Sequence, residues 1–185
     1  MVRFVTKLKL ATSIVYNLHS FQFFFMAENI TPELVHQYIQ QYFLGIGLTK
    51  DQVFDAQADA YYWMRGSARL EMFITKFVSS SGFTRYYLRV FSPLLQLPPN
   101  NREQAYKYLL ELSHNSLCVK MTMRQGSDYV FAAFERDIVG MDYIEFYNMV
   151  ADMEWWADEL DDRLKTVFHT EPAPPTTPNP APPPQ

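Results

Sequence analysis

Hydrophobic and polar positions change their spacing several times along the chain, and each change predicts a new element. Over residues 34–46 the apolar side chains recur three or four positions apart, which indicates an amphipathic helix. Thr31 is a suitable N-cap for this helix, and Pro32 suits its first helical position. Gly45 and Gly47 are expected to end it.

An antiparallel sheet is expected next, because β-branched and aromatic residues become frequent from Tyr61 to Leu94. The stretches RGS at 65–67 and SSSG at 79–82 interrupt this region in the manner of turns. We therefore expect three successive strands joined as two hairpins, over residues 60–65, 68–78 and 83–91.

A second helix and a second hairpin follow the pair Pro98 and Pro99, which breaks the sheet. Asn101 and Gln104 fit a capping box at the start of this helix. Its apolar stripe consists of Ala105, Tyr108, Leu109 and Leu112. Residues 117–124 then alternate, which predicts a strand with one buried face made of Leu117, Val119, Met121 and Met123. The turn RQGSD leads to a partner strand over residues 129–134.

A long helix closes the folded part of the chain. It is expected to begin near Asp142, with Glu145 as the acid of a capping box. Its apolar stripe comprises Phe146, Met149, Met153, Trp156, Leu160 and Leu164. The sequence thus predicts an α+β fold with an antiparallel sheet and the element order α-β-β-β-α-β-β-α.

The two ends of the chain differ from this central part. Residues 1–25 have a basic start and an apolar stretch, as a secretory signal does, but polar residues interrupt that stretch and Phe25 stands where cleavage after Ala27 would need a small residue. We expect translation to start at Met26, so that residues 1–25 are a doubtful extension and 26–168 form one domain. Residues 169–185 are rich in proline, which favours an extended, disordered tail.

Composition narrows the classes of function. Hydrophobic residues make up 48% of the 185, enough for one ordinary core. The formal net charge is −4, and the first 25 residues hold only basic charged side chains, so the rest of the chain is more acidic still. This balance disfavours nucleic acid as a partner, and no apolar run is long enough to span a membrane. The single cysteine, Cys118, fits a reducing cytoplasm.

Candidate catalytic chemistry is sparse. His114 precedes Cys118 by four residues, which suggests a thiol nucleophile with its base, but neither an oxyanion-stabilising glycine motif nor a third orienting residue accompanies them. The histidines have no paired ligand spacing, and no phosphate-binding glycine pattern is present. We therefore expect no catalytic residue, no metal and no cofactor.

The last helix also carries two adjacent tryptophans, which point about 100° apart and cannot share one environment. Trp156 lies in line with the apolar stripe and is expected in the core. Trp155 projects among polar residues and is a candidate contact for a partner or a second subunit, unless the sheet edge or the tail covers it.

Carboxylates surround these tryptophans. They are expected on the face opposite the apolar stripe, in solvent rather than around a metal. The set comprises Asp152, Glu154, Asp158, Glu159, Asp161 and Asp162.

The order of elements resembles the YbjN-like family, whose members are similar in fold to the type III secretion chaperones. The resemblance covers residues 26–168 and rests on the proline-rich break, the helix closing on LLELSHNS, the hairpin LCVKMTMRQGSDYVFAAFERDI and the aromatic, acidic last helix. One departure is HNS, where Asn115 replaces a glycine-like corner and is expected to adopt the left-handed conformation.

The resemblance implies a small acidic homodimer that binds other polypeptides and catalyses nothing. Binding of an extended client needs apolar grooves and strand edges. The strand residues that could supply them, beside Trp155, are Phe73, Phe77, Tyr86, Leu88 and Val90, although core packing competes for most of these. We therefore expect a cytoplasmic, bacterial-type, chaperone-like or regulatory protein-binding domain. The alternatives are a small-molecule-binding sensory regulator, marked by an enclosed pocket, and an enzyme that uses Cys118 with His114.

Overall fold

A computed structural model describes residues 30–168, and the expectations for residues 1–25 and 169–185 lie outside them. The elements, in order, are α2 (Pro32–Gly45), α3 (Lys50–Val53), β1 (Phe54–Asp55), β2 (Ala60–Arg65), β3 (Ala68–Val78), β4 (Thr84–Gln96), α4 (Arg102–Asn115), β5 (Lys120–Met123), β6 (Tyr129–Asp137) and α5 (Tyr143–Phe168). The expected order is confirmed, with the short α3 and β1 added between the first helix and the sheet.

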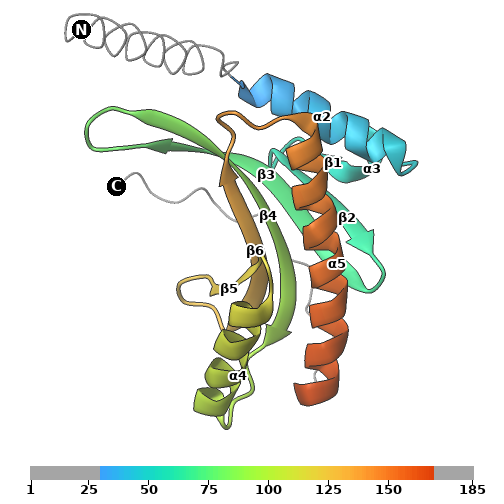
Figure 1. The fold of residues 1–185 in the computed structure, drawn as a ribbon. Coiled ribbons are helices and arrows are strands. Elements are labelled where there is room, and N and C mark those ends of the chain that lie inside the picture. The colour runs from blue at the N-terminus through green and yellow to red at the C-terminus, as the bar shows by residue number, and fades with distance from the viewer. Residues whose placement is uncertain (1–29, 169–185) are drawn as a thin grey trace, which may run out of the picture.

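The strands form one antiparallel sheet in the order β1-β2-β3-β4-β6-β5. β6 returns beside β4, which leaves the four-residue β5 at one edge and the two-residue β1 at the other. Figure 1 shows α5 running along the sheet, with α2 and α4 near its opposite ends. The fold is therefore of the α+β class, with helices and sheet in two layers.

One hydrophobic core lies between the helices and the sheet. The apolar stripe of α5 enters it as expected, except that Trp156 is only half-buried against its border. Val35, Ile39 and Phe43 of α2 and Leu109 and Leu112 of α4 belong to the same core. All three long helices thus use the same side of the sheet.

Two helix starts are confirmed by their side-chain caps. The Leu34 N–H donates to the Thr31 hydroxyl at 3.3 Å. At α5 the Glu145 N–H donates to the Asp142 carboxylate at 2.8 Å, and the Asp142 N–H donates to the Glu145 carboxylate at 3.3 Å. These reciprocal bonds satisfy backbone donors that the first helical turn leaves unpaired.

The capping box expected at α4 is wrong. Asn101 precedes the helix in the left-handed conformation, with φ of 59°, and its side chain makes no capping hydrogen bond. Asparagine tolerates this conformation better than most residues, so it serves the turn rather than the helix end. Arg102 instead anchors the start of α4 through two hydrogen bonds to Asp128, at 2.7 and 3.0 Å.

Two strands are longer than the sequence predicts. β4 continues past residue 91 to Gln96, and Pro93 lies within it, opposite Phe131. The register shifts between Pro93 and Leu95, and such an irregularity accommodates a residue that has no N–H for the ladder. β6 likewise extends beyond residue 134 to Asp137, because β4 offers partners up to Tyr87.

The corner before β5 also differs from expectation. Leu117 is 75% exposed, so the alternation over 117–124 does not begin inside a strand. Cys118, with φ of 64°, adopts the left-handed conformation that was expected of Asn115. Asn115 instead ends α4, and its side-chain amide donates to the Glu111 carbonyl at 3.0 Å.

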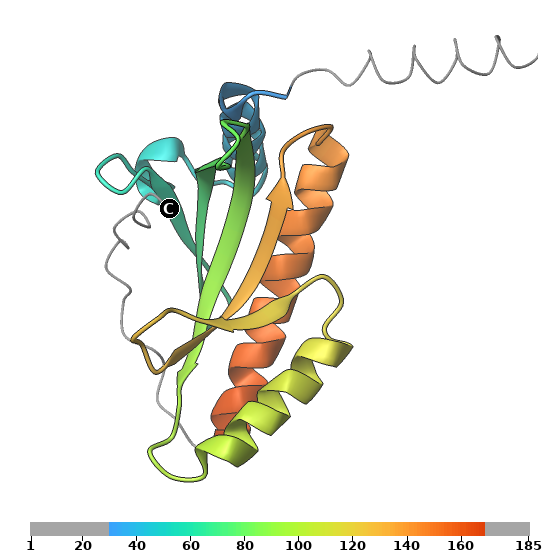
Figure 2. The same ribbon diagram turned by 90° about the vertical axis from the view of Figure 1, so that its left-hand side faces the viewer.

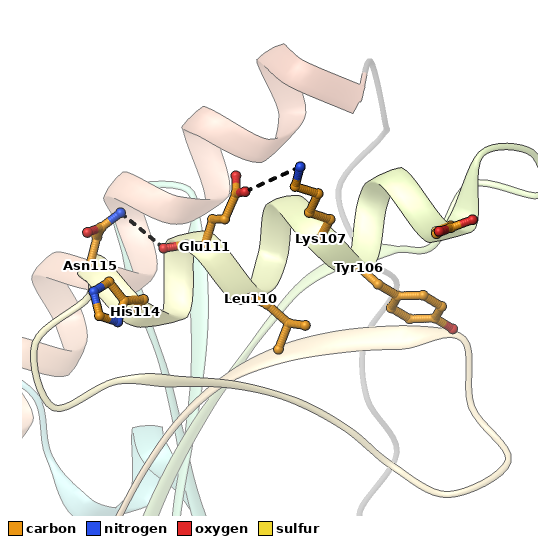
Figure 3. Close-up of a pocket in the computed structure, with 7 residues that line it drawn as sticks. Tyr106, Lys107, Leu110, Glu111, His114 and Asn115 are labelled. Atoms are coloured by element: carbon orange, nitrogen blue, oxygen red, sulfur yellow. Dashed lines mark hydrogen bonds and ion pairs between the residues drawn. The ribbon is translucent and has the colours of Figure 1, made fainter.

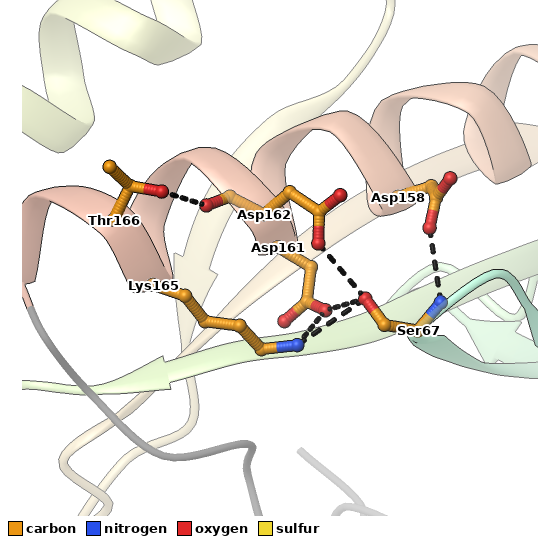
Figure 4. A network of polar contacts seen from close by, with 6 residues as sticks. All are labelled: Ser67, Asp158, Asp161, Asp162, Lys165 and Thr166. Atoms are coloured by element: carbon orange, nitrogen blue, oxygen red, sulfur yellow. Dashed lines mark hydrogen bonds and ion pairs between the residues drawn. The ribbon is translucent and has the colours of Figure 1, made fainter.

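The acidic face of α5 is only partly a solvent face, which corrects the prediction. Asp161 is buried beside the β2–β3 turn, where the Ser67 hydroxyl lies 2.6 Å from its carboxylate and Lys165 forms an ion pair with it (Figure 4). The Ser67 N–H donates to Asp158 at 3.2 Å. Gly66 has φ of 54°, and a Cβ there would lie 2.1 Å from an Asp158 oxygen. The turn is thus docked on the helix.

Glu154 is the second buried carboxylate of that face. It accepts a hydrogen bond of 2.6 Å from the Trp63 indole N–H and lies 3.9 Å from Arg65. Burial, with the Glu154 carboxylate beside it, raises the pKa of Tyr42 well above its ordinary value. Glu154 therefore joins α5 to β2 within the core.

We predict that Glu154→Ala destabilises the fold by about 1 to 3 kcal/mol, because it leaves the buried Trp63 N–H without an acceptor. Glu154→Gln keeps an acceptor oxygen and should cost less. Urea unfolding measures both, with Glu159→Ala on the exposed side of the same helix as the control. Equal costs for the alanine and glutamine variants would contradict the role given to the Trp63 hydrogen bond.

Candidate interaction surface

The side of the sheet away from the helices is called the open face here, and Figure 2 views the molecule from that side. Strand register assigns its residues, because side chains of directly opposed residues share a face. One row across the sheet contains Phe73, Arg89 and Glu135. The next row contains Tyr62, Glu71, Phe91, Ala133 and Lys120.

A second hydrophobic cluster lies on the open face, separate from the main core. Phe91, Phe131 and Ala133 are its buried members, with Phe73 and Tyr129 packed against them at its border. Phe73 and Phe91 stack with ring centroids 5.8 Å apart and planes 13° apart. Every member comes from a strand, so this aromatic cluster is formed by the sheet alone.

Two arginines cover the aromatic cluster. The Arg89 guanidinium lies 4.8 Å from the Phe91 ring centroid and 5.5 Å from that of Phe73. Arg124 lies 4.6 Å from the ring centroid of Phe131 and pairs with Glu71 at 3.1 Å. Cation–π contacts of this kind let charged side chains cover apolar rings while their polar atoms stay hydrated or paired.

Glu135 holds the basic groups of this face together. Its carboxylate forms ion pairs with Arg89 and Lys120, which come from the two strands on either side of β6. Burial opposes its ionisation, but the hydrogen bond from Lys120 and the charge of Arg89 outweigh burial and hold the pKa of Glu135 below its ordinary value. The carboxylate is therefore charged throughout the neutral range.

At one end of the sheet the β3–β4 hairpin extends past the neighbouring strands (Figure 1). β2 pairs with β3 only as far as Met72, and β6 pairs with β4 only as far as Tyr87. We call the projecting part, residues 73–86, the arm. Three large apolar side chains near its tip are about half exposed, namely Phe77 at 49%, Val78 at 54% and Phe83 at 53%.

The structure distributes the residues that the sequence suggested as contacts over four places. Trp155 is 58% exposed on α5, and its ring centroid lies 4.7 Å from that of Trp156. Phe77 is exposed on the arm, and Phe73 is half-buried on the open face. Tyr86 packs against the main core. Leu88 and Val90 have no exposed area at all, so the core takes both and they are not surface contacts.

Sequence reasoning did not select Phe131, Tyr129, Arg89 or Arg124. These four residues are brought to one face by the pairing of β6 with β4 and β5, which joins parts of the chain that are distant in sequence. Alternation within a single strand states only that two faces exist. It does not tell which of them the helices leave open.

A shallow hollow of about 570 Å³ lies along the outer side of α4 (Figure 3). Its lining residues, among them Tyr106, Leu110 and His114, all belong to this one helix, so the hollow is not enclosed between helix and sheet. Cys118 is exposed and does not line it. His114 and Cys118 are therefore not brought together in a shared pocket there.

Two further properties concern residues 30–168 only. Within that range no group of three or more histidine, cysteine or acidic side chains is arranged to hold a metal ion. None of the helices in the same range combines the length and apolar character needed to cross a bilayer.

Comparison with known proteins gives similarity of fold. No family model matches the chain, and no curated protein matches it either. The solved HopA1–SchA chaperone–effector complex contains a chain similar over 69% of this one and 93% of its own, with 8% identity and a TM-score of 0.49. YbjN from E. coli, described as a putative transcription regulator, is similar over 71% of this chain and 92% of its own, with 12% identity and a TM-score of 0.48.

These two structures are of the kinds that the order of elements resembles. The chain is an α+β domain whose helices pack on one antiparallel sheet. At these identities and TM-scores, the likeness carries no information about partners.

We predict that Glu135→Gln destabilises the fold by about 1 to 2 kcal/mol at pH 7, since it removes charged hydrogen bonds with Arg89 and Lys120. Because the pKa of Glu135 is lowered on folding, its contribution is complete above the ordinary value of 4.5 and is lost as the pH falls below it. The difference from the parent protein should shrink over that acidic range. Urea unfolding from pH 7 to 3 measures it, and a constant difference would contradict the ion-pair account.

Proposed function

We propose that this chain is a non-enzymatic polypeptide-binding domain, chaperone-like or regulatory in role, that works as a homodimer and receives its partner on the open face. The observation that carries the proposal is the aromatic cluster on a sheet face that no described helix covers. Large apolar side chains on both faces of a sheet are typical of a sheet whose two faces both meet other protein groups.

The composition of the open face supports a protein partner. Aromatic residues and arginine are the types most enriched at the centres of protein interfaces. Here Phe73, Tyr129 and Arg89 lie together, and the arginine is already paired with Glu135. A partner would therefore meet apolar rings and paired charges rather than a field of one sign, which suits an apolar polypeptide segment better than a phosphate backbone.

The alternative of a small-molecule sensor has less support. Ligand sites of that class are mostly enclosed and gather a few polar groups inside an apolar cavity. The α4 hollow is lined by a single helix and opens to solvent. The proposal also assigns no reaction to His114 and Cys118, because the hollow that contains the histidine does not include the thiol.

Affinity capture from the lysate of its own cells tests the proposal with matched variants. Phe73→Ala and Tyr129→Ala each remove a border residue of the aromatic cluster, and Tyr129 lies away from the arm. We predict that the polypeptides retained by the parent protein fall by about tenfold with each variant, as expected for hot-spot residues. Leu110→Ala, which removes an exposed side chain of α4, should retain them fully.

Two results would argue against the open face. Retention of the same polypeptides by both cluster variants would remove that face from the contact. Loss with Trp155→Ala but not with Tyr129→Ala would place the contact on the helix layer instead. Circular dichroism of each variant checks that the fold is retained.

A further inference from the structure

The outer edge of β3 has no strand beside it along the arm. β2 ends its pairing at Met72, whereas β4 remains paired with β3 on the other side to the last pair, Val78 with Thr84. Within residues 30–168, the main-chain groups that point outward between Phe73 and Val78 therefore face no partner strand. Unpaired edges of this kind add a strand from another chain readily.

This edge carries only one of the devices that normally protect an edge, the charged side chain of Lys76. The other five residues of its sequence, FITKFV, are strongly β-forming, and it contains no proline. The pairing with β4 runs from Glu71 to Val78 without a bulge that would turn the edge away. Phe77 and Val78 remain about half exposed there. An edge strand of six residues with this composition favours association with another strand over exposure to solvent.

We infer that the partner on this edge is a second copy of the chain, joined β3 to β3 in an antiparallel pair centred on Thr75. The inference rests on the homodimer of the proposed function and names its surface. The strand is complementary to itself in this arrangement.

A two-fold axis perpendicular to the sheet pairs only residues of the same face, so it must pass through a residue rather than between two. Two registers use most of the free edge, one centred on Thr75 and one on Lys76. The second sets Lys76 directly against its own copy, and like charges in that position destabilise a sheet. The first sets Thr75 against Thr75 and Phe73 against Phe77 of the second copy, both favourable cross-strand pairs.

The consequence for function is a joined binding face. Phe73, Thr75 and Phe77 belong to the open face, since they are opposite Arg89, Tyr87 and Arg85 of β4. Pairing of the two edges makes one continuous sheet, with the aromatic clusters of both copies on the same side. An extended partner could then contact both clusters at once, which raises its affinity without any new kind of contact.

Disulfide trapping tests the register. The only cysteine is first removed as Cys118→Ser. Thr75→Cys then places the two introduced thiols on directly opposed residues, about 4.5 to 5.5 Å apart between Cα atoms, which a disulfide can span. Lys76→Cys is the matched control. Its two copies are roughly 8 Å apart in the Thr75 register, beyond the reach of a disulfide.

We predict that mild oxidation gives a covalent dimer with Thr75→Cys and none with Lys76→Cys. Thr75→Lys should weaken the dimer by roughly tenfold in light-scattering mass against concentration, because it opposes two like charges, whereas Thr75→Val should leave it intact. A covalent dimer with Lys76→Cys instead would overturn the register and the inference.

The failure of this inference is distinguishable from failure of the homodimer. A parent protein that remains a monomer at all concentrations would overturn both. A parent dimer that neither forms the Thr75→Cys disulfide nor responds to Thr75→Lys would overturn the β3 edge alone. The homodimer would then need another surface, and the open face would keep its proposed role.

Discussion

Both faces of the sheet are rich in large side chains, but the helices of the described part cover only one of them. That constraint shapes the rest of the molecule. On the covered side, α5 supplies a long apolar stripe, and α2 and α4 complete the same core. On the open side, the sheet must make its own rings compatible with water, and it does so with arginines held in place by Glu135 and Glu71. The arginines cover the cluster without closing it permanently, since their contacts with the rings are modest in energy.

Local signals predicted much of this fold because the relevant physics acts over a few residues. The bounds of β2 and β3 follow from turns at RGS and SSSG, and the starts of α2 and α5 follow from the side chains of Thr31 and Asp142. In each case the residue that ends or begins the element also satisfies its backbone groups.

The remaining features depend on partners distant in the sequence. The sequence predicts this strand only as far as residue 91, but the ladder of β4 to β6 continues past Pro93 with a shift in register. Glu154 and Asp161 have the spacing of a solvent face, yet Trp63 and Ser67, more than ninety residues earlier, draw them into the interior. The aromatic cluster also depends on distant partners, because its members are separated along the chain and meet only through strand pairing. No periodicity within one element contains that information.

The β2–β3 turn illustrates how such distant contacts restrict change in the sequence. Gly66 leaves no room for a Cβ because an Asp158 oxygen occupies the space, and Ser67 satisfies charges on the next turn of the same helix. A side chain at position 66 fits only if a smaller residue replaces Asp158. A longer turn would lose its contacts with α5 altogether. The hairpin and the C-terminal helix are therefore expected to vary together among relatives, with compensating pairs at these positions.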